Sequence, residues 1–326
     1  MEPTGVREMR RHERRLREVA ELYWVERCSQ ADIAEQQSIS RATVSRMLEE
    51  ARERGIVRFH LADAHDRMPE LEEALRARWS AAGRGVRFRV ALQFKRNLAE
   101  DDYVLGRVAT RAMAAELRAR DRRTVAVASS RTMAPVVPFA ESLGPLERVS
   151  ELLGVSTRSA SAPVGEQLAV ATGAGYDAIA SPFVHREVER AQAARRSVEL
   201  AGALGRARRA SVALVGANST QRFDGTGGYS PVPSGLLAEG AERGAVGHVC
   251  GWFLDAAGAR VPSSLDELRV GIEPSEFVTI PHRVLLAWGV AKAPIIAAAV
   301  AAGLCTTVVT DATTARALLD PVSSAG

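Results

Sequence analysis

Two polar stretches of this chain directly follow short apolar runs, where the strands of a parallel sheet would end. The first is Ser129-Ser130-Arg131-Thr132, which comes after the apolar run 124–128. Its hydroxyls, its guanidinium and the backbone N–H groups of the turn are groups that bind a phosphate or a polyol. We therefore interpret Ser130, Arg131 and Thr132 as one side of a ligand site.

The second stretch is Trp288-Gly289-Val290-Ala291-Lys292, between the apolar run 283–287 and a predicted helix. Gly289 would let the backbone approach a ligand closely, the helix start favours an anion, and Lys292 supplies positive charge. Either stretch alone is equally typical of an ordinary polar turn. Two such turns at strand ends of one sheet favour a shared binding site.

A third set of polar side chains shares one face of a predicted helix over 40–54. Ser40 has the residue type of an N-cap, and Val44, Met47, Leu48 and Ala51 form an apolar stripe at helical spacing. The opposite face carries short hydrogen-bonding groups and two arginines, which suit base edges and phosphates: Arg41, Thr43, Ser45, Arg46 and Glu49.

A shorter helix precedes this one. Ser29 and Asp32 have the spacing of a capping box, and residues 37–39 form a tight connection. Gly55 is placed to stop the second helix, and residues 56–61 alternate like the strand of a small wing. The pattern predicts a winged helix-turn-helix, and a plain helical hairpin is the alternative.

Arginines also crowd the start of a predicted helix over 10–26. They either approach DNA phosphates or form a solvated face with pairs such as Glu13 with Arg17. Residues 1–61 hold 12 Arg and 11 Asp plus Glu, a net charge of only +1 (12 − 11). The affinity for DNA must therefore come from the local placement of basic side chains, and a dimer would add further contacts.

Strand and helix patterns alternate over the remaining chain. After a linker at 62–66, a helix over 68–79 either pairs with its copy in a second subunit or packs on the next domain. We predict strands at 87–94, 124–128, 149–155, 176–181, 211–216, 283–287 and 306–310, and helices at 101–120, 186–204, 291–302 and 313–319. A hairpin is predicted at 247–261 around 255–258, and Asp311 is expected to cap the last helix.

This alternation predicts an α/β fold with a mostly parallel sheet that is covered on both faces. We expect a DNA-binding domain over 1–61, a linker and connecting helix over 62–86, and an effector and oligomerisation domain over 87–320. Ligands of such sheets bind beyond the carboxyl ends of the strands.

Composition narrows the function classes. The 326 residues contain 46% hydrophobic and 25% charged residues, with no apolar run of 18 or more. We expect no membrane segment, no signal peptide and a cytoplasmic location, which the three widely spaced cysteines also fit. The six histidines do not have the spacing of metal ligands, and no set of catalytic residues can be recognised. We therefore expect that the protein binds no metal and no cofactor and is not an enzyme.

The sequence resembles the SorC/DeoR-type sugar-binding transcriptional regulators of bacteria over residues 14–320. The likeness is strongest over 16–61, 244–261 and 278–319. The resemblance implies a helix-turn-helix joined to an effector domain similar to the ribose-phosphate isomerase and glucosamine-phosphate deaminase fold. It also implies a sugar or sugar-phosphate effector, and homodimers or homotetramers.

The resemblance assigns residues position by position. The DNA-reading motif falls on Gln30, Ser40, Arg41, Thr43, Ser45 and Arg46. The effector loop falls on Arg131 and Thr132, the phosphate loop on Gly289 and Lys292, and the start of the last helix on Asp311.

Three segments depart from the family pattern, all of them in the effector region. Ala128–Thr132 stands where the family has Gly-Trp-Gly-Arg-Thr, and Trp288-Gly289 stands where it has Gly-Gly. Gly247–Trp252 replaces Gly-Asp-Ile-Cys-Gly-Arg, with His248 and Trp252 in place of the acid and the arginine.

We therefore predict a ligand-responsive transcription regulator that binds double-stranded operator DNA as a dimer or tetramer. One alternative is an isomerase- or deaminase-like enzyme with a DNA-binding appendage. Another is a regulator whose effector pocket is degenerate and serves oligomerisation only.

Overall fold

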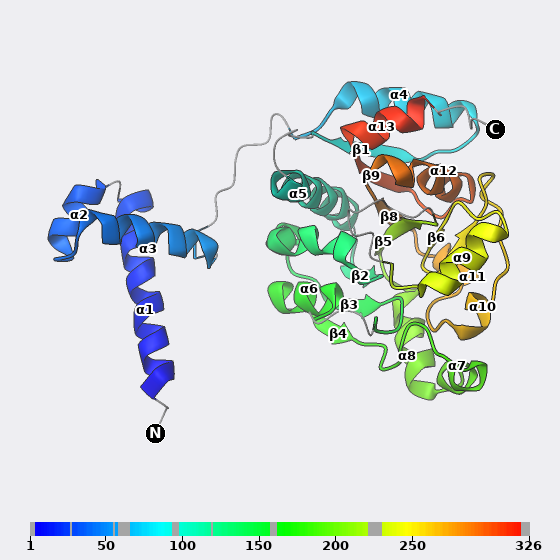
Figure 1. The fold of residues 1–326 in the computed structure, drawn as a ribbon, viewed down its shortest axis with the longest axis horizontal. Helices are drawn as coiled ribbons and strands as arrows, with labels where there is room; N and C mark the ends of the chain where they lie inside the picture. The colour runs from blue at the N-terminus through cyan, green and yellow to red at the C-terminus, as the bar shows by residue number, and fades with distance from the viewer. Residues whose placement is uncertain are drawn as a thin grey trace. The chain divides into compact units, whose positions relative to one another are not determined.

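The computed structural model describes residues 4–26, 28–54, 56–57, 66–92, 98–118, 120–156, 162–220 and 230–320 (Figure 1). Contacts divide the chain into two compact units, 1–64 and 65–326. Each unit has its own buried core.

The first unit is a helix-turn-helix preceded by one long helix, as predicted. Helix α1 (Thr4–Ala20) continues into a short π-helix, η1 (Glu21–Val25), and is followed by α2 (Gln30–Gln36) and α3 (Arg41–Glu53). The apolar stripes of the helices meet in one core whose fully buried members are Leu16, Ile33, Val44 and Ala51. The core follows from the helical spacing of these side chains.

Local hydrogen bonds define where α2 begins. The Asp32 N–H donates to Ser29 Oγ (3.2 Å) and the Ser29 N–H donates to Asp32 Oδ2 (3.0 Å), which confirms the capping box. Hydrogen bonding by the Ser29 side chain and by the Ser29 N–H stabilises the carboxylate and holds the pKa of Asp32 below its usual value. Gly55 and most of the predicted wing, 58–61, lie outside the described residues, while Ile56 and Val57 pack against the core.

The second unit is built on a sheet whose seven main strands are all parallel. In spatial order they are β1 (Arg87–Ala91), β9 (Thr307–Asp311), β8 (His282–Leu286), β5 (Val212–Ser219), β2 (Thr124–Val127), β3 (Arg148–Glu151) and β4 (Gly175–Asp177). Two short antiparallel strands, β6 (Gly247–Val249) and β7 (Trp252–Leu254), extend from the end of β5.

The chain reverses direction across this sheet between β2 and β5. It runs outward through β2, β3 and β4, then returns to β5 on the other side of β2. In open parallel sheets, ligands bind beyond the strand ends at such a switch point.

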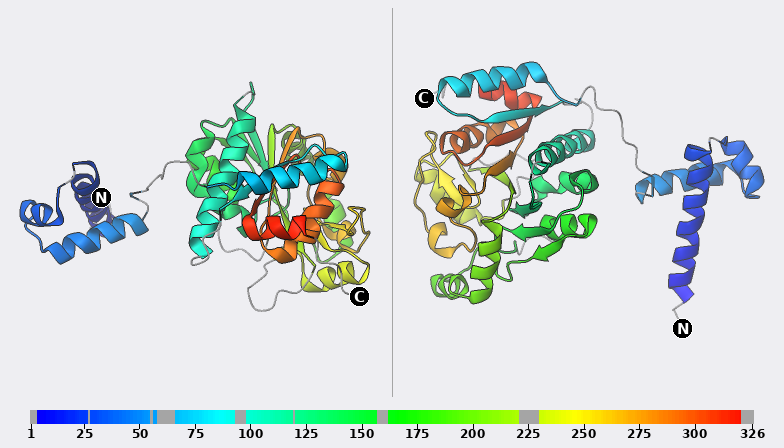
Figure 2. Two further views of the ribbon diagram at one scale, coloured as in Figure 1. Left: turned by 90° about the horizontal axis from the view of Figure 1, so that it is seen from above. Right: turned by 180° about the vertical axis from the view of Figure 1, so that it is seen from behind.

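Helices cover both faces of the sheet, as predicted (Figure 1). One face carries α5 (Leu98–Leu117), a long 3₁₀ segment, η2 (Arg131–Leu143), and α6 (Val164–Thr172). The other carries α4 (Pro69–Ala81), α8 (Val198–Ala207), α12 (Ala293–Ala301) and α13 (Ala312–Leu319). Figure 2 shows the same two layers from behind. The remaining elements are α7 (Val188–Arg195), α9 (Ser234–Glu242), α10 (Leu265–Leu268), α11 (Pro274–Phe277) and η3 (Val290–Lys292).

The predicted connecting helix, α4, packs on β1 and α13 within the second unit. The segment before it is tied to the sheet edge, because the Leu92 N–H donates to the Asp66 carbonyl (2.8 Å). Arg107 and Arg111 of α5 both donate to the Asp66 carboxylate, Arg111 at 3.1 Å.

Several predicted boundaries were wrong. The helix expected over 186–204 breaks at Ser197, whose Oγ accepts the Leu200 N–H (3.1 Å) and so caps α8. The hairpin expected around 255–258 is confirmed, because Leu254 pairs with Arg260 and the Asp255 N–H donates to the Ala259 carbonyl (3.0 Å). A second turn at Cys250 and Gly251, both at positive φ, was not predicted and divides the expected strand 247–254 into β6 and β7. The strand expected at 176–181 is only three residues long, and η2 was not foreseen.

Candidate functional sites

The exposed face of α3 carries the residues predicted to read DNA. Arg41, Ser45 and Arg46 are exposed, Thr43 is half-buried, and Gln30, at the start of α2, is half-buried as well. Arg46 Nε lies 3.4 Å from the Ala42 carbonyl, so its stem runs along its own helix.

Ser40 and Thr43 also have a structural task. Ser40 Oγ accepts the Thr43 N–H (3.1 Å) and lies 2.8 Å from Thr43 Oγ1, so the two hydroxyls together cap α3. Arg41, Ser45 and Arg46 are therefore the side chains of this face with the greatest freedom to contact a ligand.

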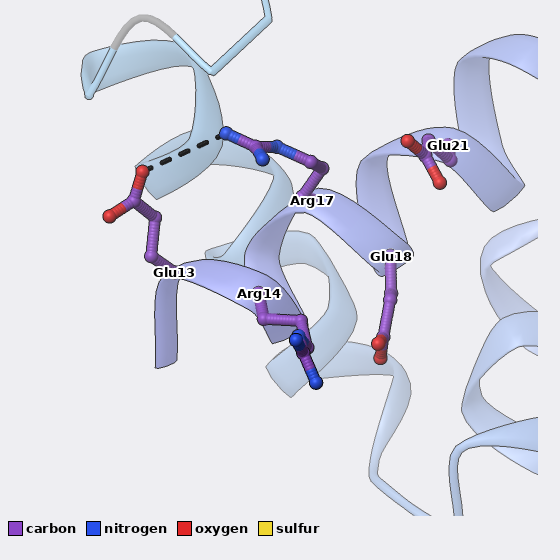
Figure 3. Close-up of a pocket in the computed structure, with 5 residues that line it drawn as sticks. All are labelled: Glu13, Arg14, Arg17, Glu18 and Glu21. Carbon is purple, nitrogen blue, oxygen red and sulfur yellow. Dashed lines mark ion pairs between the residues drawn. The ribbon is translucent and has the colours of Figure 1, made fainter. Parts of the chain in front are cut away.

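The arginines of α1 are partly engaged with acids of the same helix. Figure 3 shows an open surface hollow lined by Glu13, Arg14, Arg17, Glu18 and Glu21, in which Glu13 and Arg17 form an ion pair at 3.8 Å. This is the i,i+4 pair expected of a solvated helix face. Mixed charge in the hollow gives it no preference for an anion, so α3 is the better candidate for DNA contact.

In the second unit, the loop after β2 lies at the switch point. Ser130 Oγ is 3.8 Å from where a Cβ on Gly216 of β5 would lie, and the Leu286 carbonyl of β8 is 3.7 Å from that point. Arg131 is exposed and Thr132 half-buried at the start of η2. The three predicted residues thus sit beside the ends of β5 and β8.

A buried carboxyl that the sequence did not single out supports this loop. Glu151 ends β3 and is 4% exposed, and it accepts the hydroxyls of Ser129 (2.7 Å) and Tyr176 (3.1 Å). The Gly165 N–H donates to Ser129 Oγ (3.0 Å). Burial raises the pKa of Glu151 to about 7, against the opposing effect of these hydrogen bonds. The signal in the sequence was a lone acid in an apolar strand.

Hydrogen bonds to the N-terminal end of α13 hold the loop after β8 in place. Asp311 Oδ1 accepts the Thr314 N–H (2.6 Å), which confirms Asp311 as a helix cap. The Gly289 N–H donates to Thr314 Oγ1 (2.7 Å), with Asp311 Oδ2 at 3.3 Å. Gly289 has φ +97°, a backbone conformation that residues with a Cβ rarely adopt, which explains why a glycine stands at this position. The Gly289 N–H is therefore already hydrogen-bonded within the protein, and the role of Asp311 is to position the loop.

Lys292 ends this loop at the first turn before α12. Its ammonium lies 5.7 Å from the centre of the Trp288 ring, and burial lowers the pKa of Lys292. Since β5 lies between β2 and β8, the two loops are roughly 10 Å apart at the strand spacing of a sheet. That separation suits a small ligand between Ser130 on one side and Lys292 on the other.

Other kinds of site have less support in the described ranges. No group of three metal-binding side chains is found among the described residues, and none of their helices is long and apolar enough to cross a membrane. The glycine-rich stretch 224–228 lies outside the described residues.

Comparison with known proteins agrees with this architecture. The family described as "Putative sugar-binding domain" matches residues 65–320, and "Winged helix-turn-helix DNA-binding" matches residues 20–58. The transcriptional regulator LsrR of Enterobacter sp. (strain 638) is 29% identical over 315 residues, covering 92% of this chain and 91% of that protein. The deoxyribonucleoside regulator of Bacillus subtilis (strain 168) is 26% identical over 313 residues, covering 93% and 96%.

Two solved structures share the fold. The full-length sorbitol operon regulator SorC from Klebsiella pneumoniae has a TM-score of 0.66 at 21% identity and covers 94% of this chain and 99% of its own. A domain of a sugar-binding transcriptional regulator from Arthrobacter aurescens TC1 has a TM-score of 0.65 at 22% identity, covering 79% and 100%. The chain therefore belongs to the sugar-binding domain family of SorC/DeoR-type transcriptional regulators, with a helix-turn-helix ahead of that domain.

Proposed function

We propose that this protein is a DNA-binding transcription regulator whose affinity for its operator is set by a sugar or sugar phosphate. The observation that carries the proposal is the joining, in one chain, of an α3 with exposed arginines to a sheet whose polar loops flank the switch point. The family match of the sheet unit supports a sugar as the ligand class.

For DNA, Arg41 and Arg46 are the proposed contacts to phosphates or guanine edges, and Ser45 the proposed contact at shorter range. Gln30 and Thr43 are proposed as minor contributors because both are half-buried, and Ser40 contributes by capping α3. A homodimer or homotetramer would place two copies of α3 in successive major grooves, as a pseudo-palindromic operator requires. We also propose that the protein acts in the cytoplasm, because a regulator must reach its operator DNA.

For the effector, Ser130, Arg131 and Thr132 would bind one end and Lys292 the other, with Gly289 and Asp311 shaping the loop between them. We propose binding without turnover, since the relatives compared above are regulators. An isomerase-like activity is the second candidate, because Glu151 is a titratable carboxyl at the same sheet edge.

The test is fluorescence anisotropy on DNA from the gene's own upstream region, at fixed salt because the affinity depends on it. A panel of sugars and sugar phosphates is then added. We expect tight binding that one phosphorylated sugar shifts, and loss of that shift in Lys292→Ala with DNA binding unchanged. A Lys292→Ala protein that still responds would show that the effector site is misplaced. Release of product from the same sugar phosphate would favour the enzyme.

A further inference from the structure

Asp66 holds the chain at the point where it enters the larger unit. It is the second residue of that unit and the first one that the structure describes. Its carbonyl accepts the Leu92 N–H just beyond β1 (2.8 Å), and its carboxylate accepts bonds from Arg107 and from Arg111 (3.1 Å) of α5. The Asp66 side chain is 12% exposed, so water competes little for these bonds. Asp66 therefore fixes where the connection to the first unit begins.

Arg107 leaves part of its guanidinium unpaired. Its side chain is 7% exposed, and Nη2 donates to the Asp66 carboxylate. Nε and Nη1 are buried and have no hydrogen-bond partner among the described residues, and the guanidinium carbon lies 5.3 Å from the centre of the Tyr103 ring. Buried donors without acceptors cost free energy, so the packing of α5 must hold Arg107 in this position. A shift of α5 therefore changes the contact between Arg107 and Asp66.

The same part of α5 packs on η2, which begins in the candidate effector loop. A Cβ on Gly106 would overlap the Pro135 carbonyl, so the residue next to Arg107 is in backbone contact with η2. The Thr110 hydroxyl donates to the Gly106 carbonyl (2.8 Å) and lies 3.5 Å from the Val136 carbonyl. This interface leaves no room for η2 to move alone, because close-packed backbones transmit a displacement. A ligand that displaces η2 would therefore displace α5 as well.

We infer that α5 couples the effector loop to the DNA-binding unit through the contact of Arg107 with Asp66. A ligand that binds one position of η2 more tightly than another shifts α5, and so changes how the connection to the first unit is held. Arg107 and Asp66 are positioning residues in this account and touch neither ligand. The inference rests on the proposed function and adds the means of its regulation.

The first experiment uses Asp66→Asn, which removes the charge and keeps the size of the side chain. Operator anisotropy of the full chain is measured with and without D-ribose 5-phosphate, D-glucose 6-phosphate or D-fructose 6-phosphate. Calorimetry measures binding of the same compounds without DNA. Asp177→Asn is the matched control, because Asp177 is also buried between two arginines (Arg148 and Arg206, both 2.9 Å) but ends β4, at the opposite edge of the sheet from β1.

We expect one compound to shift the operator affinity of the wild-type chain by about fivefold or more, and that shift to fall below about twofold in Asp66→Asn. The calorimetric affinity for the compound should stay within about threefold of wild type, because Asp66 lies outside the candidate effector loops. Asp177→Asn should keep the full shift. Loss of coupling while both ligands still bind is not the result of a general loss of structure. If circular dichroism shows that Asp66→Asn does not fold, Arg107→Met replaces it with the same expectation.

A second experiment needs no effector. Gly106→Ala forces α5 away from η2 and should change the operator affinity of the ligand-free chain by about threefold or more, but by less than about 1.5-fold when Asp66→Asn is also present. Gly205→Ala is the control, because nothing lies within 4 Å of its added Cβ. If Gly106→Ala does not fold, Phe139→Leu replaces it, since Phe139 of η2 packs on Tyr103 of α5.

The outcomes separate the inference from the proposed function. An equal sugar-phosphate shift in wild type and Asp66→Asn would overturn the inference alone, as would an effect of Gly106→Ala that is the same in both backgrounds. If no compound shifts the wild-type chain but the two substitutions are coupled, the route through α5 stands and regulation by a sugar fails. A wild-type chain that does not bind the upstream DNA would overturn the proposed function and the inference together.

Discussion

Glu151 illustrates what a single buried carboxyl does at the end of a strand. Its oxygens accept the Ser129 and Tyr176 hydroxyls, so the carboxyl fixes the start of the loop that carries Ser130. A Cβ on Gly165 would lie 2.3 Å from Glu151 Oε1, so a larger residue at this position would displace the Glu151 carboxyl. Glu151 is thus a positioning residue for the candidate effector loop.

The raised pKa of Glu151 makes stability depend on pH. Burial raises this pKa to about 7 from 4.5, so the folded chain holds the proton more tightly than the unfolded chain. The stability gained is complete below pH 4.5 and is lost as the pH rises to about 7. We expect wild type to lose up to about 3 kcal/mol relative to Glu151→Gln between pH 4.5 and 8, measured by urea unfolding. Glu147→Gln, an exposed acid nearby, should leave the pH profile as it is in wild type.

A substitution of Arg46, also at the scale of a single residue, tests whether the exposed face of α3 contacts DNA. Truncation by Arg46→Ala removes an exposed guanidinium from α3 and should weaken operator binding by about 1–3 kcal/mol if it reads a base. Anisotropy at fixed salt measures the effect. Arg190→Ala, an exposed arginine of α7, is the control. A change below a few tenths of a kcal/mol would remove Arg46 from the contact surface.

At the scale of elements, the close packing of α5 on η2 keeps the effector loop in place. A Cβ on Gly106 of α5 would lie 1.9 Å from the Pro135 carbonyl, and Tyr103 packs edge-on against Phe139 (4.6 Å between ring centres). The 3₁₀ form of η2 follows from Pro135 and Pro138, which cannot donate the hydrogen bonds of an α-helix. The loop carrying Arg131 and Thr132 is therefore anchored by a backbone-to-backbone contact.

Substitution of that glycine tests the contact. Gly106→Ala forces two backbones apart and should destabilise the sheet unit by about 1–3 kcal/mol or more, measured by thermal or urea unfolding. Gly205→Ala in α8 is the matched control, because nothing lies within 4 Å of its added Cβ. That variant should be neutral or more stable by about 0.5–1 kcal/mol. Equal effects of the two substitutions would contradict tight packing of α5 on η2.

At the scale of the whole molecule, the chain contains two separate hydrophobic cores, so each compact unit has a free energy of unfolding of its own. Ile33 lies in the core of residues 1–64 and Ile296 in the core of residues 65–326, and both are fully buried. We propose that the two units unfold in separate transitions, since each buries its own apolar surface.

The same substitution in each core tests this proposal. Ile33→Val should cost about 1 kcal/mol and lower the melting temperature of the small unit by about 4–8 °C. Ile296→Val should instead lower only the larger unit's transition, by about 2–4 °C. Differential scanning calorimetry separates the two. A single transition that both variants shift equally would show that the units unfold together.

Many structural features of this protein can be predicted from the sequence alone, because the residues that indicate them are close together in the chain. The capping box at Ser29 and Asp32 and the apolar stripe of Val44 to Ala51 involve residues a few positions apart, so helical geometry fixes them. The alternation of strand and helix patterns likewise predicted a parallel sheet with two covered faces. These features also pointed to the DNA face and to the strand-end loops.

Tertiary structure alone decided which residues surround those loops, because strand order joins residues far apart in the sequence. Strand order places the loop after β2 beside Gly216 and buries Glu151 between Ser129 and Tyr176. Local patterns contain no information on which strands become neighbours, or on which polar atoms lose water when they do. The engagement of the Gly289 N–H by Thr314 depends on those neighbours, and so on the folded chain.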